Sequence, residues 1–209
     1  MRTRIRLIGL AAIVAASVSC GDVVRQGSSP VFLVIDQLTA SAGGKGTSAT
    51  GSGFLLSDVI TNITTPDPCK PDSPCPTVFN DTGSAILRAP LKDTGATAPL
   101  SATSNNEVTI NRLHIEYVRA DGRNTPGIDV PFPFDSAVTG TISAGGTLTL
   151  GFELVRHVAK EESPLIQLRS ASNIINTIGR VTFYGVDRVG NNVSVMGQIQ
   201  IEFGNFGDQ

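Results

Sequence analysis

The sequence of 209 residues has no tryptophan and only two tyrosines, and charged residues make up 16% of it. A sugar-binding platform is therefore not expected, because stacking on a sugar ring requires aromatic faces. Lysine and arginine form no cluster after residue 20, and the formal net charge is −2. A nucleic-acid-binding protein normally presents a basic face, so we expect no nucleic acid among the partners of this protein.

Catalytic motifs are also missing. The two histidines, His114 and His157, do not form a His-x-x-x-His pair, and there is no Gly-x-Ser-x-Gly elbow. The glycine-rich stretch 40–53 lacks the Walker spacing of a phosphate-binding loop, because Lys45 is followed by Gly46. We interpret both histidines as surface residues. The sequence predicts a protein that is not an enzyme and that uses no metal or cofactor.

Several aspartates fall in or near expected loops. Carboxylates at strand ends can bind Ca²⁺ in extracellular modules, often weakly. We interpret these residues instead as solvated turn residues and turn caps, which is the commoner role of aspartate in loops. The aspartates concerned are Asp58, Asp81, Asp121, Asp129, Asp135 and Asp187.

The residues that are plentiful suit strands and turns. Glycine occurs 22 times and proline 12 times, and threonine, valine and isoleucine are common. This composition favours an all-β protein over a helical bundle. Because the chain shows no internal repeat and no long linker, we expect one domain covering residues 31–209.

The first twenty residues have the order of an export signal: positive charges, a short apolar segment at 7–16, and small residues before Cys20. The apolar segment is too short to span a membrane, which takes about 20 residues. An ordinary export signal, with Cys20 an incidental thiol, is one interpretation.

The other interpretation is that residues 1–20 resemble the signal of bacterial lipoproteins. The resemblance implies a signal peptide at 1–19, a diacylglycerol on the sulfur of Cys20, and a tether at 20–30. It also implies a lipid-anchored protein of the bacterial cell envelope. Gly21 follows the cysteine in place of the aspartate that often retains lipoproteins at the inner membrane, which favours the outer membrane. A soluble periplasmic or secreted protein is the alternative.

The chain has three cysteines, and an unpaired thiol in an oxidising compartment needs an explanation. If Cys20 carries lipid, Cys69 and Cys75 remain as one pair, with five residues between them. Zn²⁺ usually takes four ligands, and no histidine lies nearby in the sequence. We therefore predict a disulfide between Cys69 and Cys75, with a metal site as the alternative.

The apolar pattern predicts short strands. A buried strand is expected at 31–38 and a second strand at 54–61. A strand interrupted by Gly83 is expected at 78–91, and an alternating strand at 147–155. In 108–118 the alternation changes parity at Asn111-Arg112, which predicts a β-bulge there. A short helix within 162–172, with Ser163 as N-cap and Pro164 at its first position, is a further expectation.

The last thirty residues predict a strand, a turn and a second strand. A loop of three residues at 190–192 would pair Phe183 with Ile199, so that apolar side chains lie opposite each other. The same register would set Gly185 opposite Gly197 and leave room there for a bulky neighbour from a facing sheet.

Seven or so short strands separated by turns predict an antiparallel two-sheet sandwich. The closing hairpin, with its FYGVDRVGN, resembles the final strands of bacterial immunoglobulin-like domains, which implies an immunoglobulin-like topology. A β-barrel of lipocalin type is the alternative architecture.

For function, we expect a non-catalytic envelope lipoprotein whose sandwich binds a protein partner or serves as an accessory piece of an assembly. Its partners would be the membrane, through the lipid on Cys20, and an unidentified envelope protein. The alternative is a small-ligand-binding lipoprotein with an internal pocket. An enclosed cavity of about 300 Å³ or more would distinguish the second from the first.

Overall fold

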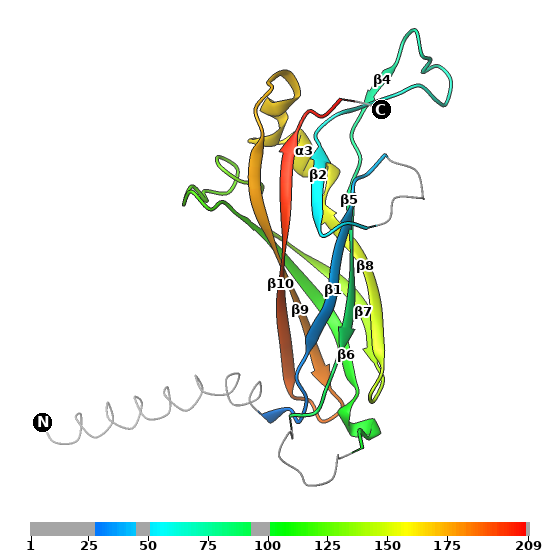
Figure 1. The fold of residues 1–209 in the computed structure, drawn as a ribbon, viewed down its shortest axis with the longest axis vertical. Coiled ribbons are helices and arrows are strands. Elements are labelled where there is room, and N and C mark those ends of the chain that lie inside the picture. The colour runs from blue at the N-terminus through cyan, green and yellow to red at the C-terminus, as the bar shows by residue number, and fades with distance from the viewer. Residues whose placement is uncertain (1–27, 45–50, 93–100, 208–209) are drawn as a thin grey trace, which may run out of the picture.

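The computed structural model describes residues 28–44, 51–92 and 101–207 (Figure 1), and most of these residues lie in strands. The strands are β1 (Val34–Ser41), β2 (Phe54–Asp58), β3 (Thr61–Ile63), β4 (Cys75–Thr77), β5 (Asp81–Arg88), β6 (Val108–Val118), β7 (Phe134–Ile142), β8 (Thr147–Val155), β9 (Ile175–Asp187) and β10 (Asn192–Gly204). The helical segments are η1 (Ser104–Asn106), α3 (His157–Glu161) and η2 (Leu165–Ser170).

The strands form two main sheets and one small one. The larger sheet has the order β2-β10-β9-β6-β7, the smaller has β1-β5-β8, and β3 pairs with β4. Every pairing is antiparallel except that of β2 with β10, which is parallel. The prediction of an all-β, antiparallel two-sheet sandwich is confirmed. The described strands form separate sheets, not the single closed ring of the alternative lipocalin-type barrel.

The two main sheets are joined along one side by the tight turn between β7 and β8. The amide of Gly146 donates to the Ser143 carbonyl at 2.9 Å, and Gly145 has φ +72°. The two strands then stay close together, because a Cβ on Gly140 would lie 2.7 Å from Leu148 Cδ2. On the other side of the sandwich, β1 and β10 belong to different sheets and run alongside each other (Figure 1).

Strand β6 shows how the sequence pattern fills the core. The β-bulge predicted at Asn111-Arg112 is confirmed, because the pairing of β6 with β9 shifts register between Ile110 and Arg112. The extra residue restores a single buried face, as expected for a period of two. That face carries Val108, Ile110, Leu113, Ile115 and Tyr117.

Aromatic rings fill the space between the sheets. The rings of Phe152 on β8 and Phe183 on β9 meet edge to face at 5.5 Å, and both side chains are buried. Each such burial stabilises the fold by about 1.5–3 kcal/mol. The interruption expected at Gly83 is wrong: β5 runs through Gly83, where a Cβ would lie 2.4 Å from the Phe152 ring. Glycine at this position makes room for the aromatic ring.

The closing hairpin has the predicted faces but another register. Phe183 pairs with Val195 and not with Ile199, and Gly197 lies opposite Val181 and not Gly185. The loop has three residues as predicted, but they are 188–190 and not 190–192. A displacement by an even number of residues leaves each side chain on its predicted face.

The register is set by the chemistry of the turn. The Asp187 amide donates to the Asn191 carbonyl at 3.0 Å, and Gly190 has φ +89°, a conformation that favours glycine. The Asp187 carboxylate accepts hydrogen bonds from the amides of Val189 and Asn191 and from the Asn191 side chain. Three-residue hairpin loops commonly end in such a left-handed glycine.

The helix expected within 162–172 is also different. The structure has the α-helix α3 before this segment and the 3-10 helix η2 within it, with Pro164 as the N-cap of η2 and no side-chain cap hydrogen bond from that residue. Ser163 does not cap the segment. The segment is fixed by burial of Leu165 and Leu168 against the core.

The described chain begins at the end of the sandwich that carries the β9–β10 turn (Figure 1). Ser29, within the predicted tether, is buried, and its hydroxyl is one of the groups that hydrogen bond to Asp187. The Pro30 carbonyl accepts a hydrogen bond from the Lys92 amide at 2.9 Å. Residues 29 and 30 are thus fixed to the domain before β1 begins.

Candidate binding groove between strands β1 and β10

The predicted disulfide is present. Cys69 and Cys75 are bonded, with their Cα atoms 5.3 Å apart, and the bridge closes the small β3–β4 hairpin. Figure 1 places this hairpin at the end of the molecule opposite the β9–β10 turn. The bridge therefore stabilises a surface hairpin and does not connect the two main sheets. Cys20, the predicted lipidation site, lies outside the described residues.

His114 belongs to a polar cluster on the outer face of the larger sheet. Its Nδ1 lies 3.3 Å from the Asp135 carboxylate, which also binds Arg112 Nη1 at 2.7 Å. Arg112 stacks over the Tyr184 ring at 3.9 Å. Partial desolvation acts to raise the pKa of Asp135, but hydrogen bonds from Arg112 and His114 outweigh it and lower that pKa. The cluster is an ordinary cross-strand arrangement of opposite charges.

His157 is the first residue of α3, two positions after β8 ends at Val155. Its Nδ1 lies 2.9 Å from Asn80 Oδ1, and Asn80 also donates to Glu153 at 2.7 Å. These contacts join the start of α3 to the beginning of β5. His157 and His114 therefore have different partners and form no joint site.

The aspartates mostly cap turns or pair with arginines. Asp121 binds Arg119 and Arg123, whose hydrogen bonds hold its pKa well below the ordinary range. Asp129 accepts a hydrogen bond from the Thr125 amide. Within the described ranges, no three histidine, cysteine, aspartate or glutamate side chains are grouped so that they could hold a metal ion.

Asp81 is the exception among the aspartates, because it lies in a buried polar network. Its Oδ2 lies 2.8 Å from Lys160 Nζ and accepts a hydrogen bond from the Ser57 hydroxyl at 2.6 Å, and its Oδ1 accepts from the Gly43 amide at 2.8 Å. Lys160 and Asp81 are each 1% exposed. Since solutes cannot reach these groups, the network connects α3, β2, β5 and the end of β1 and does not bind a substrate.

Sequence reasoning missed Lys160, which stands among charged residues in HVAKEE and has no apolar signature. A buried lysine is rare unless it is paired. Its partner is 79 positions away in the chain, as the two residue numbers show, and no local pattern connects the two.

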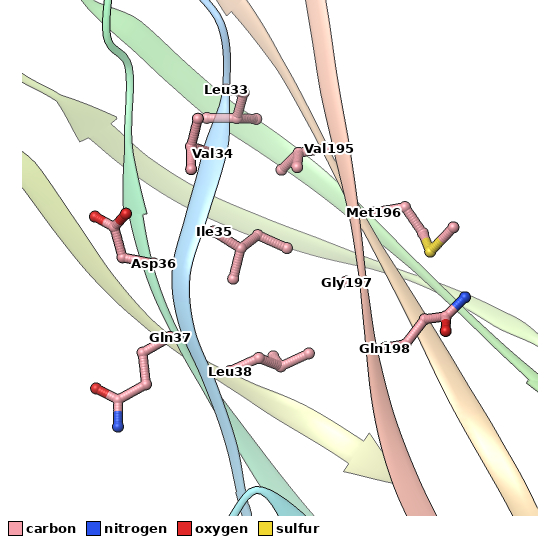
Figure 2. A pocket seen from close by; sticks show the side chains of 10 residues that line it. All are labelled: Leu33, Val34, Ile35, Asp36, Gln37, Leu38, Val195, Met196, Gly197 and Gln198. Carbon is pink, nitrogen blue, oxygen red and sulfur yellow. The ribbon is translucent and has the colours of Figure 1, made fainter.

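A groove runs between β1 and β10, with a volume of about 530 Å³. Residues 33–38 form one wall and residues 195–198 form the other (Figure 2). Ile35 and Leu38 point toward β10, whereas Asp36 and Gln37 point away from it. A Cβ on Gly197 would lie 2.8 Å from Ile35 Cδ1, so the two sheets approach closely at the floor of the groove.

The groove exists because β2 covers only part of β10. Strand β2 pairs with residues 200–204 of β10, and within the described ranges residues 192–199 pair with β9 alone. The chain before β2 turns toward β1, where the Ser52 and Ala40 backbones exchange hydrogen bonds at 2.8 Å. Among the described residues, eight residues of β10 therefore form an edge of the sheet, and residues 195–198 of this edge line the groove. Alternating patterns in the sequence identify buried faces but not strand edges, so this feature was not predicted.

A second hollow, of about 790 Å³, lies beside the disulfide hairpin. Phe79, Phe206 and Ile63 contribute apolar surface to it, and Asp58 and Thr61 contribute polar groups. Gly44 and Gly207, which also line it, are each followed by residues outside the described ranges. The groove between β1 and β10 has walls that lie within continuous strands, which makes it the better-defined site.

Comparison of the chain with protein-family models, with curated proteins and with solved structures found no match in any of the three. In the part of the chain that the structure describes, no helix is both long and apolar enough to cross a membrane. Function must therefore be argued from the molecule itself.

Proposed function

We propose that this protein is an exported, lipid-anchored envelope protein whose β-sandwich is a non-catalytic binding or accessory module for a protein partner. The observation that carries the proposal is the groove between β1 and β10. It combines the apolar side chains of Ile35, Leu38 and Val195 with an edge of β10 that has no strand on it among the described residues. Open strand edges pair readily with other polypeptides.

The packing of the sandwich supports a protein partner over a small internal ligand. Side chains such as Phe183, Leu113 and Leu87 have no exposed surface and fill the space between the sheets. The two hollows described above lie at the edges and surface of the sandwich. A site of this shape suits a segment of polypeptide better than a compact solute.

The anchor follows from the signal-like N-terminus. A diacylglycerol on Cys20 would hold the domain firmly, because two acyl chains bind a bilayer far more strongly than one. We expect Cys20→Ala to prevent lipidation and to leave the protein either uncleaved or released in soluble form, with the fold of the domain unchanged. Cell fractionation with N-terminal sequencing tests this. A wild-type protein that is soluble and starts at a residue other than Cys20 would exclude the anchor.

The partner is tested in the cells that produce the protein. A photo-crosslinking amino acid is placed at single exposed positions on each face of the membrane-attached protein, including Gln198 at the groove and Thr149 on the outer face of β8. A binding module gives one discrete adduct with a second envelope protein from neighbouring positions. If no position on any face gives an adduct, the proposed function is wrong.

A further inference from the structure

We propose that the partner binds by adding a β-strand to the larger sheet, paired with the main chain of β10 along residues 192–199. This inference rests on the proposed function and specifies how its partner is recognised. The occupant is an extended, uncharged polypeptide segment of another protein, with an apolar residue at every second position.

The direction of the main-chain groups supports this pairing. In an antiparallel ladder, alternate residues direct both their amide and their carbonyl to the same side. The Asn191 carbonyl accepts from Asp187 in the β9 strand, whereas the Gly204 carbonyl accepts from Val59 just after β2. The register of β9 and β10 has no shift. The main-chain amides and carbonyls of odd-numbered residues of β10 therefore point toward β9, and those of even-numbered residues point toward the opposite edge.

The main-chain donors and acceptors of Ser194, Met196 and Gln198 thus point toward the groove. Strand β2 already uses the same edge of β10 further along, where it pairs in parallel with residues 200–204. An added strand would lie in line with β2. Eight residues at about 3.3 Å each give it a length of about 26 Å.

The free edge of β10 also lacks the features that prevent a sheet edge from pairing with another strand. Sheet edges in soluble proteins are commonly protected by lysine, proline or a bulge. Residues 192–199, NVSVMGQI, contain no charged residue and no proline, and their register with β9 is regular. The segment is therefore competent to pair along its whole length.

The side chains beside this edge define the chemistry of the added strand. Ile35, Leu38 and Val195 are partly buried and line the inner side of the groove. Asp36 points away and is paired with Arg88 at 2.5 Å, so it gives the groove no free charge. Inward side chains of the added strand would therefore meet apolar surface, which favours an apolar residue at every second position.

A second copy of this protein fits the edge less well than a single strand does. In each copy, β1 lies along the same side of β10 as the free edge. Two β10 edges could approach each other only if both β1 strands moved aside. A lone extended segment takes up less room beside β1 than the sheet edge of a second copy does, and this is why we assign the edge to another polypeptide.

The first test uses a defined probe and the purified full-length mature protein. The probe is a fluorescent peptide of eight alternating valines and threonines with a lysine at each end, and its control is the same peptide N-methylated at alternate amides. Ser194→Pro removes one outward-facing amide without touching the ladder to β9, as proline at an edge allows. We expect Ser194→Pro to weaken peptide binding about tenfold and Ser194→Thr to leave it unchanged.

Circular dichroism checks that Ser194→Pro keeps the fold, and Met196→Pro repeats the test at the next outward amide. Strand addition is supported by three results together. The unmodified peptide binds, N-methylation of one set of alternate amides abolishes this binding, and both proline variants weaken it. Equal binding of the methylated and unmodified peptides, or unchanged binding by both folded proline variants, overturns it.

The second test separates this inference from the proposed function. With the photo-crosslinker at Gln198 and at Thr149 in the producing cells, strand addition predicts an adduct with another protein from Gln198 only. An adduct from Thr149 alone keeps the partner and excludes the β10 edge. An adduct of twice the protein's mass identifies a second copy, and a crosslink within one chain identifies an intramolecular strand. Either of these outcomes overturns the inference.

Discussion

Replacing Lys160 by methionine should destabilise the domain more than any exposed substitution. The side chain is 1% exposed, and its ammonium group is the only cation that the described structure places in contact with the equally buried Asp81. Methionine has a similar length and no charge, so the packing is largely kept while the carboxylate loses its ion partner. The Ser57 hydroxyl and the Gly43 amide remain as hydrogen-bond donors to it.

Removing one member of a buried ion pair costs about 3–5 kcal/mol, because it leaves an uncompensated buried charge. For a domain of this size, each kcal/mol lowers the melting temperature by about 2–4 °C. Lys160→Met should therefore lower the melting temperature by about 10 °C. Equilibrium urea unfolding followed by circular dichroism measures the free energy directly, and it suits a chain that has no tryptophan.

The matched control is the double variant Lys160→Met with Asp81→Asn. Asparagine removes the buried charge and can still accept a hydrogen bond from the Gly43 amide. Much of the lost stability should therefore return, with a coupling free energy of about 1–3 kcal/mol between the two positions. The reasoning is refuted if Lys160→Met costs under about 1 kcal/mol, or if the effects of the two substitutions simply add.

Two further predictions concern the closing hairpin. Phe183→Ala should cost about 2–5 kcal/mol in the same unfolding assay, because Phe183 is fully buried, and Tyr184→Ala should cost less; the reverse order would contradict the assignment of faces. Burial acts to raise the pKa of Asp187, but hydrogen bonds from Asn191, Ser29 and Val189 outweigh it and lower that pKa below 3.8. The stability that Asp187 contributes is therefore complete above about pH 4 and is lost as the pH falls through its folded pKa. Asp187→Asn should reduce the loss of unfolding free energy that occurs as the pH falls below about 4. An unchanged loss would count against the stabilising role of the Asp187 carboxylate in the turn.

Local patterns in the sequence predicted the parts of the fold that depend on local physics. The bulge of β6 follows from a change of parity at Asn111-Arg112, and β8 follows from regular alternation between Thr147 and Val155. The disulfide followed from counting cysteines in a chain that was expected to be exported. For the bulge and for β8 the signal lies within a dozen residues, and the rest of the molecule does not alter it.

The features that sequence reasoning missed depend on distant or fine interactions. The hairpin register is decided by hydrogen bonds to the Asp187 carboxylate, which an apolar pairing rule does not include. The pair of Lys160 and Asp81 forms only when α3 packs beside β5. The groove depends on where β2 ends against β10, so it is a property of sheet order, and residue patterns do not determine sheet order.

The end of the domain at which the described chain begins determines how a mechanical force would act on β1. The described chain enters the domain at one end, while the disulfide hairpin lies at the other (Figure 1). If the N-terminus is anchored as proposed, a force that a bound partner applies to the domain would act along β1 and would shear it against β5. The hydrogen bonds that pair Val34–Ser41 of β1 with β5 are perpendicular to this force. They would therefore bear the force together and would have to break at the same time. Strand β1 would then resist mechanical unfolding of the domain. The lifetime of the domain under force would depend on its unfolding rate and not on its equilibrium stability.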